Sequence, residues 1–188
     1  MYLILTILTI LSSFLTNLET KTLQSDFTVT VSEEVNAPMN YPGSLVMQGD
    51  RFRLSMFDIE AAYDGKTLYM YSAQIDELTL SNPTEQELLE ANPFLYARAL
   101  VDVCHVVERE TSDHTQTIVT LTPNDQTIGI NRFVLKLRNE DLMPLSVEIK
   151  EGKQTTVLKL NEPKFIPSSP HPFTLSPDKD TYINDMRL

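Results

Sequence analysis

The segment Tyr41–Ser81 alternates apolar and polar residues almost without interruption through several short runs. Alternation places every second side chain on one face of an extended strand, so the pattern predicts an antiparallel meander. One predicted face carries only aliphatic, Met and Phe side chains, namely Leu45, Met47, Phe52, Leu54, Met56, Leu68, Met70, Leu78 and Leu80. We therefore expect an apolar sheet surface that covers either the protein's own core or an apolar ligand.

The length and charge of the chain restrict its organisation and its partners. With 188 residues, we expect residues 1–188 to form a single domain with a substantial core. A net charge of −11 argues against nucleic acid or anionic membrane surfaces as primary partners, because both would be repelled. A basic partner surface stays possible. The single cysteine, Cys104, excludes an internal disulfide and fits either the cytosol or the periplasm.

Residues 1–18 contain no charged side chain and are mostly apolar. They lack the basic start and the small-residue cleavage site of a typical signal peptide, and their polar residues make a membrane span marginal. Apolar residues recur at helical spacing at Leu8, Leu11, Leu15 and Leu18, which predicts an amphipathic helix packed on a sheet. The alternative is an export signal, of which residues 1–13 would be a remnant.

Two short helices are expected between the strands. Thr84 can cap the first with Glu87 as its reciprocal partner, and Asn92-Pro93 can start the second. The apolar residues on or near one face of the second helix are Phe94, Leu95, Leu100 and Val101.

The remaining pattern is that of a large sheet. A first strand is expected at residues 27–31, and five further alternating segments lie between residues 103 and 161, before a Pro-rich tail. The total is ten or eleven strands, and sheets of this size curl to avoid long exposed edges. We predict a mainly β protein with helices (α+β), an unclosed and strongly curved antiparallel barrel whose helices cover the concave face and leave a cavity there.

The residues that usually carry catalysis are scattered. His105, His114 and His171 have no metal-ligand spacing. Cys104 and His105 are neighbours on a predicted strand, so their side chains point to opposite faces and cannot pair as nucleophile and base. The five glycines form no phosphate-binding loop. We expect no catalytic residue, no metal ligand and no cofactor, and therefore a protein that is not an enzyme.

Several short segments occur in an order that resembles a known family. They are Gly43-Ser44-Leu45, Arg51-Phe52-Arg53, Asp64-Gly65-Lys66-Thr67 followed by Tyr69 and Tyr71, and the terminal INDMR. In this order, over nearly the whole chain, they are similar to the periplasmic outer-membrane lipoprotein carrier family (LolA-like). The resemblance implies an unclosed barrel lidded by helices. Its cavity would carry the acyl chains of lipoproteins from an inner-membrane lipoprotein-releasing transporter to an outer-membrane acceptor, without chemistry of its own.

The resemblance also implies a monomer in the periplasm with a lipid-binding cavity. The expected lining residues are Leu45, Met47, Phe52, Leu54, Met56, Leu68, Met70, Leu78, Leu80, Phe94, Leu95 and Leu100. Two departures mark a divergent branch. Gln48 stands where better-known members have an arginine that helps to hold the helical lid, and Leu54 and Tyr69 replace the family's usual Trp residues.

Three functions follow as hypotheses. The first is a carrier or chaperone for the acyl chains of lipoproteins. The second is a non-enzymatic envelope adaptor, or another lipid-binding protein, with a filled core. The third is a hydrolase, which the scattered polar residues disfavour.

Overall fold

A computed structural model describes residues 9–33, 36–167, 169, 171–176 and 178–187. Leu8 and most of the predicted export-signal remnant, residues 1–8, lie outside the described residues. Residues 9–13 belong to a helix.

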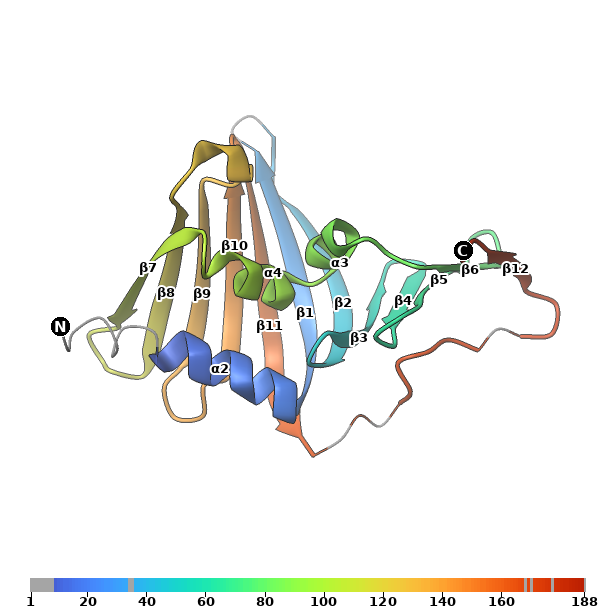
Figure 1. The fold of residues 1–188 in the computed structure, drawn as a ribbon, viewed down its shortest axis with the longest axis horizontal. Coiled ribbons are helices and arrows are strands. Elements are labelled where there is room, and N and C mark those ends of the chain that lie inside the picture. Colours follow the sequence, from blue (N-terminus) through green and yellow to red (C-terminus); the bar gives the residue numbers. More distant parts are fainter. Residues whose placement is uncertain (1–8, 34–35, 168, 170, 177, 188) are drawn as a thin grey trace.

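The described residues form one open sheet and three α-helices (Figure 1). The helices are α2 (Thr9–Thr20), α3 (Glu85–Ala91) and α4 (Pro93–Leu100). The strands are β1 (Thr22–Glu33), β2 (Met39–Gln48), β3 (Arg51–Met56), β4 (Ile59–Tyr63), β5 (Leu68–Ser72), β6 (Glu77–Ser81), β7 (Cys104–Glu110), β8 (Gln116–Pro123), β9 (Arg132–Arg138), β10 (Pro144–Glu151), β11 (Gln154–Ile166) and β12 (Tyr182–Asp185).

The spatial order of the strands is β12-β6-β5-β4-β3-β2-β1-β11-β10-β9-β8-β7. Neighbours pair antiparallel except β12, which runs parallel to β6. The order is linear and ends at β12 and β7, so the sheet does not close. The predicted half-barrel is confirmed, with the helices over one face (Figure 1).

The sheet contains 12 strands, one or two more than the pattern predicted. The meander of residues 41–81 was expected to hold four strands and holds five, β2 to β6. The strand that the pattern did not show is β4, where the adjacent residues Ala61 and Ala62 interrupt the alternation of large apolar and polar side chains.

The centre of the sheet contains a pairing between strands that are far apart in sequence. Strand β1 pairs with β2 on one side and with β11 on the other, so that Phe27 lies opposite both Gly43 and Leu160. This pairing brings the N-terminal third of the chain beside its last long strand. The concave face therefore combines side chains from β1–β3 with side chains from β8–β11.

The core lies between this concave face and the helices. The predicted helical stripe is confirmed for Leu11 and Leu18, which are buried, and Leu15 is partly buried. Phe14 is fully buried as well, and its ring packs edge-on against Phe94 of α4 with 5.7 Å between the centroids. Thus α2 and α4 share one core with the sheet.

Both predicted helix starts in the middle of the chain are confirmed. Thr84 caps α3, with its hydroxyl accepting from the backbone N–H of Glu87, while the Glu87 carboxylate accepts from the Thr84 backbone N–H at 2.7 Å. Asn92 caps α4 immediately before Pro93. None of the helices in the described part of the chain has the length and apolar run needed to span a bilayer.

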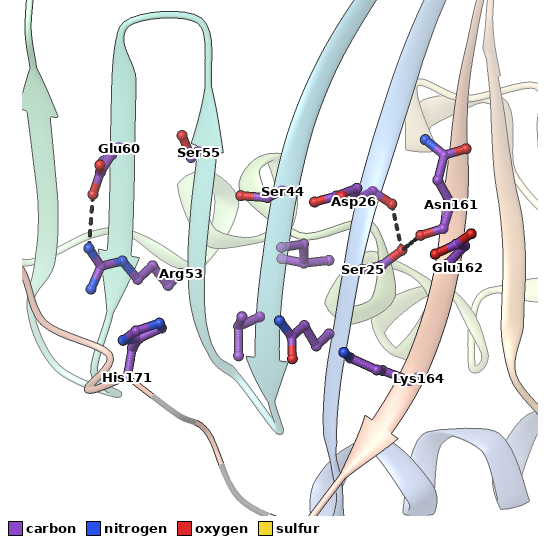
Figure 2. A pocket seen from close by; sticks show the side chains of 13 residues that line it. Ser25, Asp26, Ser44, Arg53, Ser55, Glu60, Asn161, Glu162, Lys164 and His171 are labelled. Atoms are coloured by element: carbon purple, nitrogen blue, oxygen red, sulfur yellow. Dashed lines mark hydrogen bonds and ion pairs between the residues drawn. The ribbon is translucent and has the colours of Figure 1, made fainter.

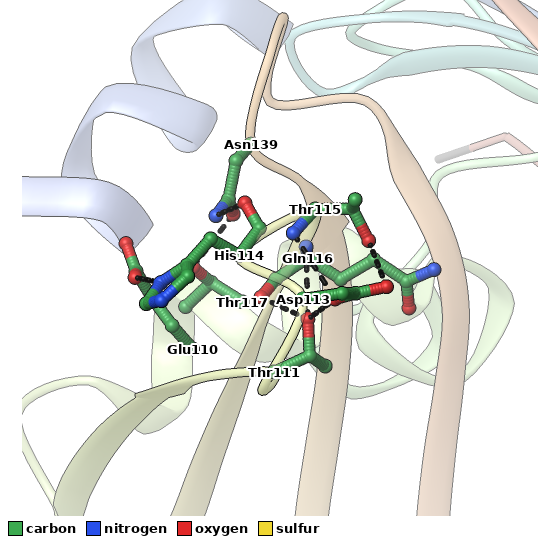
Figure 3. Close-up of polar contacts among 8 residues, drawn as sticks. All are labelled: Glu110, Thr111, Asp113, His114, Thr115, Gln116, Thr117 and Asn139. Atoms are coloured by element: carbon green, nitrogen blue, oxygen red, sulfur yellow. Dashed lines mark hydrogen bonds and ion pairs between the residues drawn. The ribbon is translucent and has the colours of Figure 1, made fainter.

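The loop between β7 and β8 is organised by its own polar side chains (Figure 3). Asp113 accepts from the Thr111 hydroxyl, and the Asn139 amide donates to the backbone carbonyl of His114 at 2.8 Å. The imidazole Nδ1 of His114 lies 2.7 Å from the Glu110 carboxylate. The bond from Asn139 anchors the hairpin to the end of β9, and the imidazole of His114 contacts Glu110 of the same hairpin.

Candidate functional site

An apolar groove of about 370 Å³ lies between the concave face of the sheet and the junction of α3 and α4. The sheet contributes Phe27, Val29, Leu45, Leu54, Met56, Val147, Ile149, Thr156 and Leu158. The helices contribute Glu90, Ala91, Asn92 and Pro93. This volume falls within the usual range of small-molecule sites, and the apolar lining with few polar groups is typical of them.

The groove has a more polar extension. A neighbouring cavity of about 270 Å³ shares Glu90, Pro93, Ile149 and Thr156 with the groove. Glu90 is exposed, and its carboxylate accepts from the side chain of Gln86 at 2.8 Å. One end of the groove is therefore marked by an acidic side chain.

Asn92 forms the corner of the groove between the two helices. Its side-chain oxygen accepts from the backbone N–H groups of Phe94 at 3.0 Å and Leu95 at 3.3 Å, which fixes the first turn of α4. The residue is only 3% exposed, and its Nδ2 has no hydrogen-bond partner. The amide nitrogen of Asn92 is thus a buried donor without a partner at the junction of α3 and α4.

Three of the predicted lining residues, Leu45, Leu54 and Met56, lie in the groove. Met70 is on the same face, since the register aligns it with Ala61 and Leu54, but it is 44% exposed. Whether any of them binds lipid remains a prediction.

Five other predicted residues belong to the packed core. These residues, all buried, are Met47, Phe52, Leu68, Phe94 and Leu100. Leu95 of α4 is half-buried. They support the groove by holding the helices on the sheet.

Two predicted lining residues, Leu78 and Leu80, lie on the opposite face of the sheet, so their prediction is wrong. The register pairs Leu78 with Tyr71 and Leu80 with Tyr69, whereas Met70 of the groove face pairs with Thr79. Adjacent residues of a strand point to opposite sides. Leu78 and Leu80 are therefore buried on the outer face, and Leu78 contacts the same small cavity as the C-terminal residues Leu175 and Thr181.

The lining residues of β1, β10 and β11 were not among those predicted from the sequence. These residues are Phe27, Val29, Val147, Ile149, Thr156 and Leu158. Their alternation was visible in the sequence, but only the pairing of β1 with both β2 and β11 brings them beside Leu45. Local patterning therefore identified the strands without identifying the site.

Contacts that do not involve the Gln48 side chain join α2 to α4 and to the β2–β3 turn. Arg98 of α4 forms an ion pair with Glu19 of α2 at 3.1 Å. The backbone N–H of Gly49 donates to the carbonyl of Leu18 at 2.6 Å and ties the end of α2 to the β2–β3 turn. The side-chain oxygen of Gln48 accepts from Arg51 at 3.0 Å, on the turn itself.

The opposite face of the sheet contains a polar pocket of about 510 Å³ (Figure 2). Arg53 and Glu60 form an ion pair there at 3.0 Å. The Ser25 hydroxyl donates to the backbone carbonyls of Asp26 and Asn161, at 2.5 and 3.0 Å. Its proton is thus used in holding the β1–β11 bulge, which does not suit a nucleophile.

The described residues contain no group of three or more His, Cys, Asp or Glu side chains that could hold a metal ion. Cys104 is buried, and burial raises the pKa of its thiol, which lowers the thiolate fraction at neutral pH. Cys104 is also not among the residues that line the groove.

Known proteins resemble this chain in structure rather than in sequence. The chain matches no protein-family model. A search of curated proteins gives no match either. A solved structure of an uncharacterized conserved protein from Thermus thermophilus is similar over 93% of this chain and 96% of that chain, with a TM-score of 0.61 and 13% identity.

Two further solved structures are similar at lower scores. A chain of the Pseudomonas aeruginosa MucA/MucB complex matches 88% of this chain with a TM-score of 0.50 and 14% identity, and this chain spans 60% of its length. A LolA superfamily protein from Nitrosomonas europaea matches 87% of this chain and 97% of that chain, with a TM-score of 0.43 and 10% identity. At these identities, the likeness to the first two structures shows a shared fold.

Proposed function

We propose that this protein is a carrier of the bacterial periplasm, which binds the acyl chains of lipoproteins in the apolar groove and delivers them to the outer membrane. Its partners would be an inner-membrane lipoprotein-releasing transporter and an outer-membrane acceptor. The observation that carries the proposal is the groove between the sheet and the α3–α4 junction, whose lining is apolar apart from Glu90, Asn92 and Thr156.

The physical chemistry of the groove suits a hydrocarbon chain. Removing about ten methylenes from water contributes roughly 8 kcal/mol at about 0.8 kcal/mol per methylene, before the costs of association. Affinity therefore needs no charged contact. The Met56 side chain is flexible and polarizable, which lets the wall adapt to chains of different length.

The sequence resemblance to lipoprotein carriers supports this cargo, and the fold that it implied is the fold observed. Release would require α4 to move together with its buried side chains Phe94, Ala97 and Leu100, and the half-exposed pair between Arg98 and Glu19 would oppose that movement only weakly. No catalytic step is included in the proposal.

Native mass spectrometry of the protein, purified from membranes without detergent, tests the proposal. We expect masses that exceed that of the chain by those of acylated molecules, and their loss after extraction with organic solvent. A bare chain under gentle conditions, with no uptake of added acylated peptide, would count against a carrier.

A non-enzymatic adaptor is the second candidate. The similarity to a chain of the MucA/MucB complex favours it, because that neighbour is a member of a protein–protein assembly. An adaptor would give the bare chain in the same experiment and would bind a protein segment without any acyl group. The acidic net charge of −11 would then select a basic partner.

A further inference from the structure

The apolar groove is continuous with the more polar cavity beside it. The groove of about 370 Å³ and the neighbouring cavity of about 270 Å³ share Glu90, Pro93, Ile149 and Thr156. Beyond these four residues, the neighbouring cavity is lined by Gln86, Leu89, Tyr96 and Glu151. A hydrocarbon chain that lies in the groove can therefore continue past Glu90 into this cavity, which we call the polar extension.

The polar extension contains two carboxylates. Glu151 faces the concave side of the sheet, because it follows the groove residue Ile149 at two-residue spacing on β10. Glu90 comes from α3 and lines both cavities, and both carboxylate side chains are exposed. Burial raises the pKa of the Tyr96 phenol in the same extension, and the negative charges of Glu151 and Glu90 raise it further. The two carboxylates therefore act on the same space.

The charge of the lining has one sign and lies at one end. Among the described residues that line the groove and the polar extension, none is lysine, arginine or histidine. The groove crosses the sheet from β3 to β10, and its β3 end is formed by the apolar residues Leu54 and Met56. A ligand with a hydrocarbon chain and a polar head would therefore place its head at the β10 end, against negative charge.

We propose that the occupant is an acylated polypeptide whose first residue keeps a free α-amino group, so that its ammonium lies in the polar extension beside Glu90 and Glu151. This inference rests on the proposed function, because it assumes that an acylated polypeptide occupies the groove. It adds that the protein distinguishes a lipid-modified N-terminus with a free amino group from one whose amino group is itself acylated.

The hydrocarbon chain and the head would have separate roles. Burial of the chain supplies the affinity for every ligand of the same length. The head sets the preference, since an ammonium is attracted to the two carboxylates and an anionic head is repelled. Because both carboxylates are exposed, we expect the preference to be modest, up to about fivefold, and to be sensitive to salt.

The test uses three forms of S-hexadecyl-cysteinyl-glycine amide, with the α-amino group free, acetylated or succinylated. Their heads are positive, neutral and negative on the same chain at pH 6.5, below the ordinary α-amino pKa of about 7.7 to 8.0. Binding is measured by displacement of N-phenyl-1-naphthylamine from the full chain. We expect the positive form to bind about five times more tightly than the neutral form, and the negative form to bind most weakly. In about 1 M salt the three affinities should converge.

The variants Glu90→Gln and Glu151→Gln each remove one charge at an exposed position and keep the size of the side chain. We expect the preference for the positive over the neutral form to fall to about twofold in each, and to about one in the double variant. Affinity for the neutral form should stay the same. Glu140→Gln is the matched control, because it removes the same charge in the turn before β10, at the other end of that strand from Glu151.

The outcomes separate this inference from the proposed function. Equal affinity of the unmodified protein for the positive and the neutral form would overturn the preference and leave an acyl-chain carrier intact. Tightest binding of the negative form would overturn it in favour of an anionic lipid. The same loss of preference in Glu140→Gln as in the two groove variants would assign it to the overall charge and overturn the site. Failure of all three forms to displace the probe would overturn the carrier itself.

Discussion

The ring of Phe27 occupies the space that a side chain at position 43 would need. A Cβ added to Gly43 would lie 2.3 Å from Cζ of Phe27 and 2.6 Å from the backbone oxygen of Ser55. The two residues are directly opposite each other on β1 and β2, and Phe27 lines the groove. The absence of a side chain at Gly43 therefore decides where the aromatic wall of the groove lies.

Gly43→Ala should destabilise the protein by about 1 to 3 kcal/mol, because the methyl group must displace either the ring or a neighbouring strand. Binding of an apolar fluorescent probe should weaken as Phe27 moves. Urea denaturation measures the first effect. Ser44→Ala is the control, since this exposed neighbour should change stability by less than about 0.5 kcal/mol. Equal stability of both variants would contradict the close contact.

Leu54→Glu should abolish probe binding at a cost of roughly 1 to 2 kcal/mol in stability, because a carboxylate at the groove wall still reaches water. Phe52→Glu is the matched comparison on the same strand and face. Phe52 is 1% exposed, so a carboxylate there would be buried without a partner and should cost about 4 kcal/mol or more. Thermal melting separates the two. Similar unfolding of both variants would mean that Leu54 belongs to a filled core.

Arg98→Ala should loosen α4, since it removes the ion pair with Glu19 of α2. For an exposed pair, we expect the free energy that holds α4 in place to fall by about 0.2 to 1 kcal/mol. The rate of amide exchange across residues 93–100 should then rise by up to about fivefold. Hydrogen-exchange mass spectrometry measures it. Arg132→Ala, which breaks the exposed pair with Glu148, is the control and should leave those amides unchanged.

Gln48→Arg should not slow exchange in α4, because the side chain at position 48 contacts Arg51 on the β2–β3 turn. A second guanidinium beside Arg51 adds repulsion instead. The same exchange measurement tests this. A clear slowing in residues 93–100 would show that an arginine at this position can reach the lid.

Glu108 should make stability depend on pH. Its carboxylate accepts from the backbone N–H of Leu11 in α2 at 3.1 Å, and burial raises its pKa above the ordinary value of 4.5, outweighing the hydrogen bonds from Leu11 and Ile10 that lower it. The folded state then binds the proton more tightly than the unfolded state. The contribution of Glu108 to the free energy of unfolding is complete below about pH 4.5, the ordinary pKa of the group. It is lost as the pH rises through the pKa of Glu108 in the folded protein.

Glu108→Gln removes this titration and keeps an oxygen that accepts from Leu11. Urea midpoints measured between pH 4 and pH 8 should therefore fall less with rising pH in the variant than in the unmodified protein. Parallel curves for the two proteins would show that Glu108 does not contribute to the dependence.

Local patterning in the sequence determined most of the secondary structure. Alternation located ten of the twelve strands, all except β4 and β12, closely enough to give the fold class, because burial of one sheet face forces a period of two. The caps at Thr84 and Asn92 were equally local, since the helix-capping bonds of each residue reach only two or three positions along the chain.

The faces of the strands depended on the turns between them. Leu78 and Leu80 lie on the outer face because the β5–β6 turn, which contains Asp76 at a φ of 49°, pairs Leu78 with Tyr71. A shift of one residue would exchange the two faces. The alternating pattern of β6 is compatible with the observed register and with one shifted by a single residue. The sequence therefore did not predict which face of the sheet carries Leu78 and Leu80.

The groove itself was decided by tertiary structure. The sequence alone determined that an apolar face exists and that two short helices interrupt the strands. Only the pairing of β1 with both β2 and β11 placed Val29 and Leu158 beside Leu45, and only the packing of α4 on α2 left Asn92 buried with an unpaired donor. Contacts between residues more than 100 positions apart depend on how the whole sheet is assembled, which no local period encodes.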